Sequence, residues 1–236
     1  MKAEKIEYSH LGKTLEAYVA YDEKEKEKRP AILIFHAWKG KDDFVCEKAE
    51  MVAKLGYVGC ALDIYGKGVL GSSPEENAKL MEPFISDRRF LRDRMLSGLQ
   101  VAKDHPLVDK ERLGAMGFCF GGLCALDLAR SGAPLKGVVS LHGLLTAPED
   151  LENKAINSKV LVLHGHDDPM VPPDQVLSFE NEMTEAGVDW QVHAYGKVVH
   201  AFTNPAANNP EMGTVYSEVA EKRAMQATQN FFREIF

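Results

Sequence analysis

The sequence predicts an α/β fold in which helices cover both faces of a central, mostly parallel sheet. Continuous apolar runs such as "AILIFHA" (31–37) are typical of strands that are buried on both faces. They alternate with segments of helical spacing along most of the chain, as consecutive β-α-β units do. The 236 residues are 45% hydrophobic and 27% charged, so we expect a single domain spanning residues 1–236 around one core.

The first half of the chain supplies an edge hairpin and then two such units. "KIEYSH" and "TLEAYVAYD", separated by "LGK", predict an antiparallel hairpin at the sheet edge. After the strand at 31–37, "DFVCEKAEMVAKLG" is typical of a helix that ends at Gly56, and "YVGCALDIYG" is typical of the next strand. Ser73, Pro74 and Glu76 stand in the order of an N-cap, a first helical residue and a capping box. A long helix through "FLRDRMLSGLQVAKDH" follows.

The second half continues the alternation. "RLGAMGF" predicts a strand and "LCALDLARSG" a helix, and "GVVSLHG" and "KVLVLHG" predict two more buried strands. "PPDQVLSFENEMTEAGV" is typical of a helix and "WQVHAY" of a strand. Apolar residues at helical spacing predict a final helix from about Thr214 to Phe236.

The composition favours neither nucleic-acid nor membrane binding. The net charge is −7 and the pI is about 5.7, so anionic partners are not attracted. The opening residues contain no apolar stretch of a secretory signal, and no run of about 18 apolar residues occurs that would span a membrane. No cysteine belongs to a Cys-x-x-Cys pair or a usual zinc pattern. We therefore expect a cytoplasmic protein with reduced thiols, no metal site and, by default, a monomeric state.

The stretch "GFCFGG" (117–122) places Cys119 at a turn from a strand into a helix. Small residues around a nucleophile are what such a sharply bent turn requires, because larger neighbours would clash. The positive N-terminal end of the following helix would stabilise a thiolate there. A buried structural thiol is the alternative, since free cysteines are often core residues.

Two later loops supply the partners that a nucleophilic cysteine needs. "HGHDDPMVPP" and "VVHAFTNP" each follow a strand of the parallel sheet, so both leave its C-terminal edge. His200 would take the thiol proton, and Asp168 would orient the imidazole and stabilise its charged form. Asp167 is the alternative acid; Asp168 is favoured because it directly precedes Pro169.

Stabilisation of the oxyanion would come from backbone N–H groups. One is that of Phe120, the residue after the nucleophile. The other would come from the loop after residues 31–37, which points to Trp38. Losing such a donor typically costs about 3 kcal/mol in the transition state.

Several other residues are candidates for substrate contact, each with a structural alternative. Histidines at strand ends, His36 among them, could line a pocket or make structural hydrogen bonds. Tyr65 could contact substrate or pack at the sheet edge. Arg88 and Arg89 open a cluster that could bind an anion or form a solvated helix face. The remaining cysteines are assigned to structure: Cys46, Cys60 and Cys124.

Taken together, "GFCFGG", "DDPMVPP" and "HAFTNP", with "HAWKG" and "LDIYG", resemble the dienelactone hydrolase family of α/β hydrolases, from about residue 31 to the C-terminus. The resemblance implies an α/β-hydrolase fold and hydrolysis of lactones, enol-lactones or small carboxylic esters without a cofactor. By position, it assigns the triad to Cys119, Asp168 and His200 and the oxyanion donors to Phe120 and Trp38.

The sequence departs from the family pattern at one position. The best-studied members carry a glutamate one residue before the second oxyanion donor, where it contacts the resting thiol. Ala37 occupies that position here. Members also hold the substrate carboxylate with arginines, for which no residue of this chain aligns securely.

We therefore expect a cysteine-nucleophile hydrolase of lactones or small carboxylic esters that acts through a thioester acyl-enzyme. Its partner would be a small-molecule ester or lactone substrate. The alternatives are a broad-specificity esterase or thioesterase and a non-catalytic binding protein that keeps the fold. Ala37 is the feature that favours the last.

Overall fold

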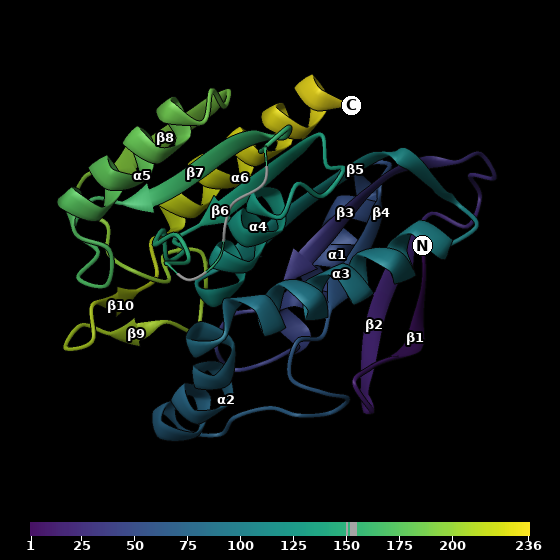
Figure 1. Cartoon of the computed structure of the whole chain (residues 1–236), viewed down its shortest axis with the longest axis horizontal. Coiled ribbons are helices and arrows are strands. Elements are labelled where there is room, and N and C mark those ends of the chain that lie inside the picture. Colours follow the sequence, from purple (N-terminus) through teal and green to yellow (C-terminus); the bar gives the residue numbers. More distant parts are fainter. Residues whose placement is uncertain (150, 152–154) are drawn as a thin grey trace.

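A computed structural model describes residues 1–149, 151 and 155–236. In the described part of the chain, a sheet of eight strands carries helices on both faces, as predicted (Figure 1). The strands of this sheet are β1 (Lys2–His10), β2 (Lys13–Tyr21), β3 (Arg29–Phe35), β4 (Val58–Leu62), β5 (Val108–Phe118), β6 (Gly137–Leu141), β7 (Lys159–Gly165) and β8 (Trp190–Tyr195). The helices are α1 (Asp43–Lys54), α2 (Pro74–Ser86), α3 (Arg88–Asp104), α4 (Phe120–Arg130), α5 (Pro173–Glu185) and α6 (Glu218–Ile235).

The strand order is β1-β2-β4-β3-β5-β6-β7-β8. All pairs from β4 to β8 are parallel, whereas β1 and β2 pair with each other antiparallel, and β2 pairs antiparallel with β4. The predicted hairpin at the sheet edge is thus confirmed. Because the central strands are parallel, the loops that follow them gather at one edge, which is where ligands bind in such sheets.

The two faces of the sheet hold separate apolar clusters. Along β3, Leu33 and Phe35 face one cluster, and Ile32 and Ile34 face the other, because side chains alternate along a strand. Buried residues of α2, α3, α4 and α5 belong to the first cluster, and those of α1 and α6 to the second. This two-sided burial explains why the central strands are continuous apolar runs. No helix in the described ranges is long and apolar enough to cross a membrane.

The helix ends follow the predicted signals with one difference. Gly56, just after α1, has φ 95°, a conformation that glycine adopts without strain. At the start of α2, the Ser73 side chain accepts a hydrogen bond from the Glu76 N–H at 3.3 Å. The Glu76 carboxylate, however, accepts from the N–H of Ser72 at 2.9 Å rather than from that of Ser73. The capping box is therefore shifted by one residue toward the N-terminus.

The prediction that the last helix begins near Thr214 was wrong by four residues. Helix α6 begins at Glu218, and the Ser217 side chain caps it by accepting from the Ala220 N–H. Residues 214 and 215 instead form a short strand, β10 (Thr214–Val215), which pairs with β9 (Asn208–Asn209). The backbone groups of Thr214 and Val215 therefore pair with the neighbouring strand rather than within the helix.

Packing of α6 against the sheet contributes to stability through Phe232, whose side chain is 1% exposed. Its ring centroid lies 6.3 Å from that of Tyr57 and 6.0 Å from that of Phe236. We expect Phe232→Ala to lower the free energy of unfolding by about 3–5 kcal/mol, measured by urea denaturation. Val219, on the same helix, is 58% exposed, so Val219→Ala should change the free energy of unfolding by less than about 0.5 kcal/mol. Equal effects of the two substitutions would contradict this account of the helix.

Candidate active site

Cys119 occupies a strained turn between β5 and α4, which we call the elbow. Its φ of 55° and ψ of −118° lie outside the regions that L-residues usually adopt. The turn is possible because the surrounding backbone is close-packed: a Cβ atom on Gly117 would lie 1.9 Å from the Gly121 carbonyl oxygen, and one on Gly121 would lie 2.2 Å from that of Phe35. The glycines of "GFCFGG" are therefore a steric requirement of this turn.

The Cys119 thiol is partly exposed and faces three groups that favour its ionised form. Its desolvation raises the pKa, but the positive charge of His200 and the backbone N–H groups of Phe120 and Trp38 lower it further than burial raises it. The net pKa of the Cys119 thiol lies below its usual value. The two residues expected to donate to an oxyanion thus direct their N–H groups at the same sulfur.

His200 is held by Asp168. Its Nδ1 lies 2.7 Å from Asp168 Oδ2, and the side chains of both residues are almost fully buried. The other carboxylate oxygen, Oδ1, accepts from the Met170 N–H at 2.8 Å. Burial opposes a charge on the imidazole, but the Cys119 thiolate and Asp168 outweigh it and raise the pKa of His200 to about 10. Asp167, the alternative acid, is exposed.

The loop that carries His200 is fixed by the β9–β10 hairpin. The His200 N–H donates to the Gly213 carbonyl at 2.9 Å, and the Val215 N–H donates to the His200 carbonyl at 3.1 Å. Gly213 also packs so closely on Pro169 that a Cβ atom would lie 2.3 Å from it, which ties the hairpin to the Asp168 loop. The sequence analysis missed this hairpin because it assigned Thr214 to the last helix.

A second buried histidine lies behind His200. The centroids of the His142 and His200 rings are 5.2 Å apart in an edge-to-face arrangement. His142 Nε2 lies 2.7 Å from the Thr203 hydroxyl, and burial together with the positive charge of His200 holds the pKa of His142 well below its usual value. These surroundings favour the uncharged form of His142.

His36 and Tyr65 contact the loop of the second oxyanion donor. His36 is fully buried; its Nε2 accepts from the Ile64 N–H at 3.2 Å, so its Nδ1–H donates to the Ala37 carbonyl at 2.7 Å. The Tyr65 hydroxyl donates to the Trp38 carbonyl at 3.0 Å. With both ring nitrogens engaged by backbone, His36 holds the loop in place, which is the structural alternative that the sequence analysis gave for this residue.

The arginines at the start of α3 have different surroundings. Arg88 is buried and forms a bidentate ion pair with Asp127 of α4, at 2.6 and 2.8 Å. Arg89 is exposed. Arg94 donates to the Ile64 carbonyl at 2.8 Å. Asp127 was missed by the sequence analysis, although a carboxylate within the apolar run "LCALDLARSG" is a signal for a buried ion pair.

A cavity of about 520 Å³ is lined by residues of α2, α3, α4 and α5 and of the loops that follow β6 and β7. Its lining includes Leu123, one helical turn after Cys119, and Met170, two residues after Asp168. The full lining is Ile85, Ser86, Arg88, Leu123, Leu144, Thr146, Ala147, Pro148, Glu149, Met170 and Gln175.

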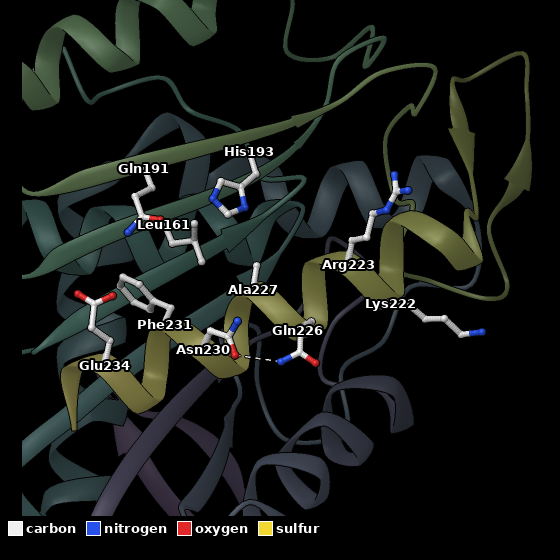
Figure 2. A pocket seen from close by; sticks show the side chains of 10 residues that line it. All are labelled: Leu161, Gln191, His193, Lys222, Arg223, Gln226, Ala227, Asn230, Phe231 and Glu234. Carbon is white, nitrogen blue, oxygen red and sulfur yellow. Dashed lines mark hydrogen bonds between the residues drawn. The ribbon is translucent and has the colours of Figure 1, made fainter.

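Another cavity, of about 570 Å³, lies between α6 and the strands β7 and β8 (Figure 2). Its lining includes His193 of β8 and Phe231 of α6. Because α6 covers the sheet face opposite to α4, this cavity is remote from the thiol. Within the described ranges, no three His, Cys, Asp or Glu side chains are grouped so as to hold a metal ion.

The parallel sheet, the strained turn and the Asp168–His200 pair at the strand ends define an α/β hydrolase. Residues 15–236 match the dienelactone hydrolase family, and the chain belongs to this family of ester and lactone hydrolases.

Individual relatives agree with this assignment. A dienelactone hydrolase-like promiscuous phosphotriesterase from metagenomic libraries is 34% identical, with a TM-score of 0.93 over 100% of this chain and 98% of its own. An uncharacterized protein of Caenorhabditis elegans is 38% identical over 62% of this chain and 94% of its own. A protein of Aquifex aeolicus, provisionally named a carboxymethylenebutenolidase, is 28% identical over 97% of this chain and 96% of its own.

The close packing of the elbow makes Gly117 intolerant of any side chain. We expect Gly117→Ala to lower the free energy of unfolding by about 3 kcal/mol or more, measured by chemical denaturation, because the new methyl group would overlap backbone atoms. Gly196→Ala is the matched control, since its Cβ would meet nothing within 4 Å. A stable Gly117→Ala protein would show that the turn does not need this glycine.

The cysteine thiols should differ in the pH at which they begin to react with an alkylating reagent. Alkylation requires the thiolate, so the lowered pKa of Cys119 predicts that its labelling by iodoacetamide reaches a plateau at a lower pH than the labelling of an ordinary thiol. Burial raises the pKa of Cys46, and that of Cys60 to about 12, so these should label only at higher pH. Peptide mass spectrometry across a pH series measures each rate.

His200→Ala serves as the control for this experiment. It removes the positive charge beside the thiol, so the labelling profile of Cys119 should move to higher pH. Coincident profiles of Cys119 and Cys46 in the unaltered protein would contradict the assigned environment.

Proposed function

We propose that the protein hydrolyses carboxylic esters or lactones through a covalent thioester on Cys119. The observation that carries the proposal is the surroundings of this thiol: His200 on one side, and the N–H groups of Phe120 and Trp38 on the other. A base, a nucleophile and oxyanion donors around one atom are the requirements of acyl transfer.

In the first half of the reaction, the Cys119 thiolate attacks the ester carbonyl carbon and forms a C–S bond. The carbonyl oxygen becomes an oxyanion, which the Phe120 and Trp38 N–H groups stabilise. When the C–O bond breaks, His200 Nε2 donates its proton to the leaving alkoxide. The products of this half are an alcohol and the thioester; for a lactone, the alcohol remains part of the bound acyl group.

In the second half, His200 removes a proton from water, which attacks the thioester carbonyl. The C–S bond breaks, the carboxylic acid leaves, and the thiolate of Cys119 is restored beside a protonated His200. Asp168 keeps the imidazole in the orientation that presents Nε2, because its carboxylate accepts the Nδ1 proton. The burial of Nε2, without a hydrogen bond of normal geometry to a described residue, is consistent with a nitrogen kept for proton transfer.

Ala37 is the feature that favoured a non-catalytic protein, because in the family pattern a glutamate at that position contacts the resting thiol. Here the charged neighbour of Cys119 is His200, which supplies a positive charge and lowers the thiol pKa without a carboxylate. The same arrangement would serve a broad-specificity esterase or a thioesterase, since these activities and lactone hydrolysis all proceed through an acyl-enzyme.

The test is turnover of p-nitrophenyl acetate, a simple lactone and dienelactone by the unaltered protein and three variants. Cys119→Ala and His200→Ala should abolish the enzymatic turnover, with a loss of at least about 10³-fold in kcat. Asp168→Asn should lower kcat by about 10³- to 10⁴-fold, because the imidazole would lose its orienting acceptor. Cys46→Ala is the control that removes a thiol away from the elbow and should retain activity.

Activity that survives Cys119→Ala would overturn the nucleophile assignment. If no substrate is turned over and Cys119 labels no faster than Cys46, the non-catalytic alternative holds. The relative rates on the three substrates would distinguish a lactonase from a broad-specificity esterase.

A further inference from the structure

The second oxyanion donor belongs to the peptide unit that joins Ala37 to Trp38. The Trp38 N–H of this unit is directed at the sulfur of Cys119, and the other polar group of the unit is the Ala37 carbonyl. A peptide unit is planar and, outside proline, almost always trans, so its N–H and its carbonyl point in opposite directions. Whatever fixes the Ala37 carbonyl therefore fixes the direction of the Trp38 N–H.

His36 holds this carbonyl. Its Nδ1 lies 2.7 Å from the Ala37 oxygen, which also accepts from the Gly40 N–H at the longer distance of 3.2 Å. The ring is fully buried, and its Nε2 lies 3.2 Å from the Ile64 nitrogen. Because a backbone N–H can only donate, Nε2 carries a lone pair, and the ring proton lies on Nδ1, where it donates to the Ala37 carbonyl. Burial lowers the pKa of His36, which favours this uncharged form.

The His36 ring is placed by the sheet itself. His36 directly follows β3, and Ile64 lies two residues after β4, which is the parallel neighbour of β3. The ring centroid lies 4.7 Å from that of Tyr65 in an edge-to-face arrangement. Tyr65 in turn donates to the Trp38 carbonyl at 3.0 Å, which belongs to the next peptide unit. Of these two side chains, His36 is thus the one that acts on the unit with the donor N–H.

A hydrogen bond at one end of a peptide unit also strengthens the other end. A donor at the carbonyl polarises the amide, and successive hydrogen bonds polarise one another in this way where the dielectric is low. The chain of donors here runs from the Ile64 N–H through the His36 ring and the Ala37–Trp38 unit to the sulfur of Cys119. An oxyanion formed at Cys119 would therefore meet an N–H that is both aimed and strengthened.

We propose that His36, as its Nδ1–H tautomer, is a positioning residue for the acyl transfer: it aims the Trp38 N–H at the oxyanion and strengthens this N–H as a donor. The inference rests on the proposed acyl transfer to Cys119. It goes beyond support of the loop, because stabilisation of the transition state then depends on one ring nitrogen, Nδ1.

Two amide substitutions separate the roles of the two ring nitrogens. The amide nitrogen of Asn lies two bonds from Cβ, as Nδ1 does, so His36→Asn can still donate to the Ala37 carbonyl. The amide oxygen of Gln lies three bonds from Cβ, as Nε2 does, so His36→Gln can accept from the Ile64 N–H but loses the donor at Nδ1.

Turnover of p-nitrophenyl acetate should distinguish these variants. His36→Gln should lower kcat and kcat/KM together by about 10²-fold or more, and His36→Asn by less than about 10-fold, since the loss of one oxyanion donor costs roughly 10²- to 10³-fold. Equal turnover by the two variants, or slower turnover by His36→Asn, would overturn the proposal.

Alkylation of Cys119 supplies a readout that a damaged elbow would not give. Iodoacetamide reacts with a thiolate without forming an oxyanion, so the plateau rate at high pH should be the same in His36→Gln and in the unaltered protein. The profile should move to higher pH in His36→Gln, because the Trp38 N–H lowers the pKa of the thiol. A lower plateau rate, or a profile that does not move, would overturn the role of His36.

His105→Gln is the matched control. This histidine is 5% exposed; its Nδ1 accepts from the Leu107 N–H at 3.3 Å, and its Nε2 lies 3.0 Å from the Glu4 carboxylate. It lies between α3 and the start of β5, at the sheet edge opposite to Cys119. The kcat and the labelling profile of His105→Gln should equal those of the unaltered protein. A loss of kcat as large as in His36→Gln would show that disturbed packing is the cause, and the proposal would fail.

The tautomer can also be measured directly on the unaltered protein. With isotopically labelled histidine, NMR spectra should show His36 with a protonated Nδ1 and an unprotonated Nε2, assigned through the nuclear Overhauser contacts between its ring and that of Tyr65. A proton on Nε2 would overturn the proposal. This measurement decides the matter if His36→Gln does not fold.

Cys119→Ala separates this proposal from the proposed function. Loss of acetate turnover in Cys119→Ala, together with equal turnover by the two amide variants, would overturn the role of His36 only. Turnover that persists in Cys119→Ala would overturn the proposed function, and with it the acyl transfer that His36 assists.

Discussion

The conformation of Cys119 is the constraint on which the rest of the site depends. An L-residue at φ 55° is strained, and the strain is tolerated because the surrounding backbone segments are in contact. Gly121 lies against the end of β3, and Gly117 lies against Gly121, so β3, β5 and α4 meet at one point. As a result, α4 begins immediately after Cys119, and its first N–H group, that of Phe120, is directed at the sulfur. The Trp38 N–H, in the loop that follows β3, is directed at the same sulfur, because the end of β3 lies against Gly121.

Three buried histidines near this turn show how surroundings decide a charge. His36 has both ring nitrogens engaged by backbone, and burial lowers its pKa. His142 is paired with a hydroxyl group, and its pKa is lowered further by the charge next to it. His200 alone has a carboxylate at Nδ1 and a thiolate facing it, and its pKa is raised to about 10. The same residue type is thus favoured in its uncharged form at two positions and in its charged form at the third.

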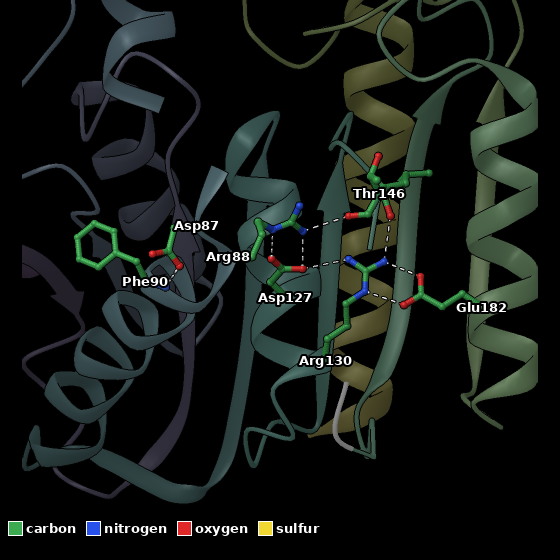
Figure 3. A network of polar contacts seen from close by, with 8 residues as sticks. Asp87, Arg88, Phe90, Asp127, Arg130, Thr146 and Glu182 are labelled. Atoms are coloured by element: carbon green, nitrogen blue, oxygen red, sulfur yellow. Dashed lines mark hydrogen bonds and ion pairs between the residues drawn. The ribbon is translucent and has the colours of Figure 1, made fainter. Parts of the chain in front are cut away.

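Buried ion pairs also join α4 to the neighbouring helix and loop. Asp127 takes part in two ion pairs, with Arg88 and with Arg130, so the helix that starts after Cys119 is joined to α3 and to the loop beyond β6 (Figure 3). Removing one partner of a buried ion pair is strongly destabilising, because the other charge is left uncompensated. In this protein, the arrangement fixes Arg88 against Asp127 and the Thr146 carbonyl.

The sequence by itself determined the α/β architecture, the order of its strands and helices along the chain, and the identity of the residues at the elbow and the two later loops. These follow from hydrophobic periodicity and from local steric needs, which depend on neighbouring residues only. Asp168 rather than Asp167 was also the favoured acid, and the structure brings Asp168 to His200 while leaving Asp167 exposed.

Only the tertiary structure decided what the long polar side chains do. The engagement of His36 by Ile64, the pairing of Arg88 with Asp127 and the contact of the β9–β10 hairpin with His200 each join residues from separate segments. The separations along the chain are large, and an arginine or histidine side chain can reach several partners. Which partner it meets depends on how helices and loops pack on the sheet, and that packing has no local signature in the sequence.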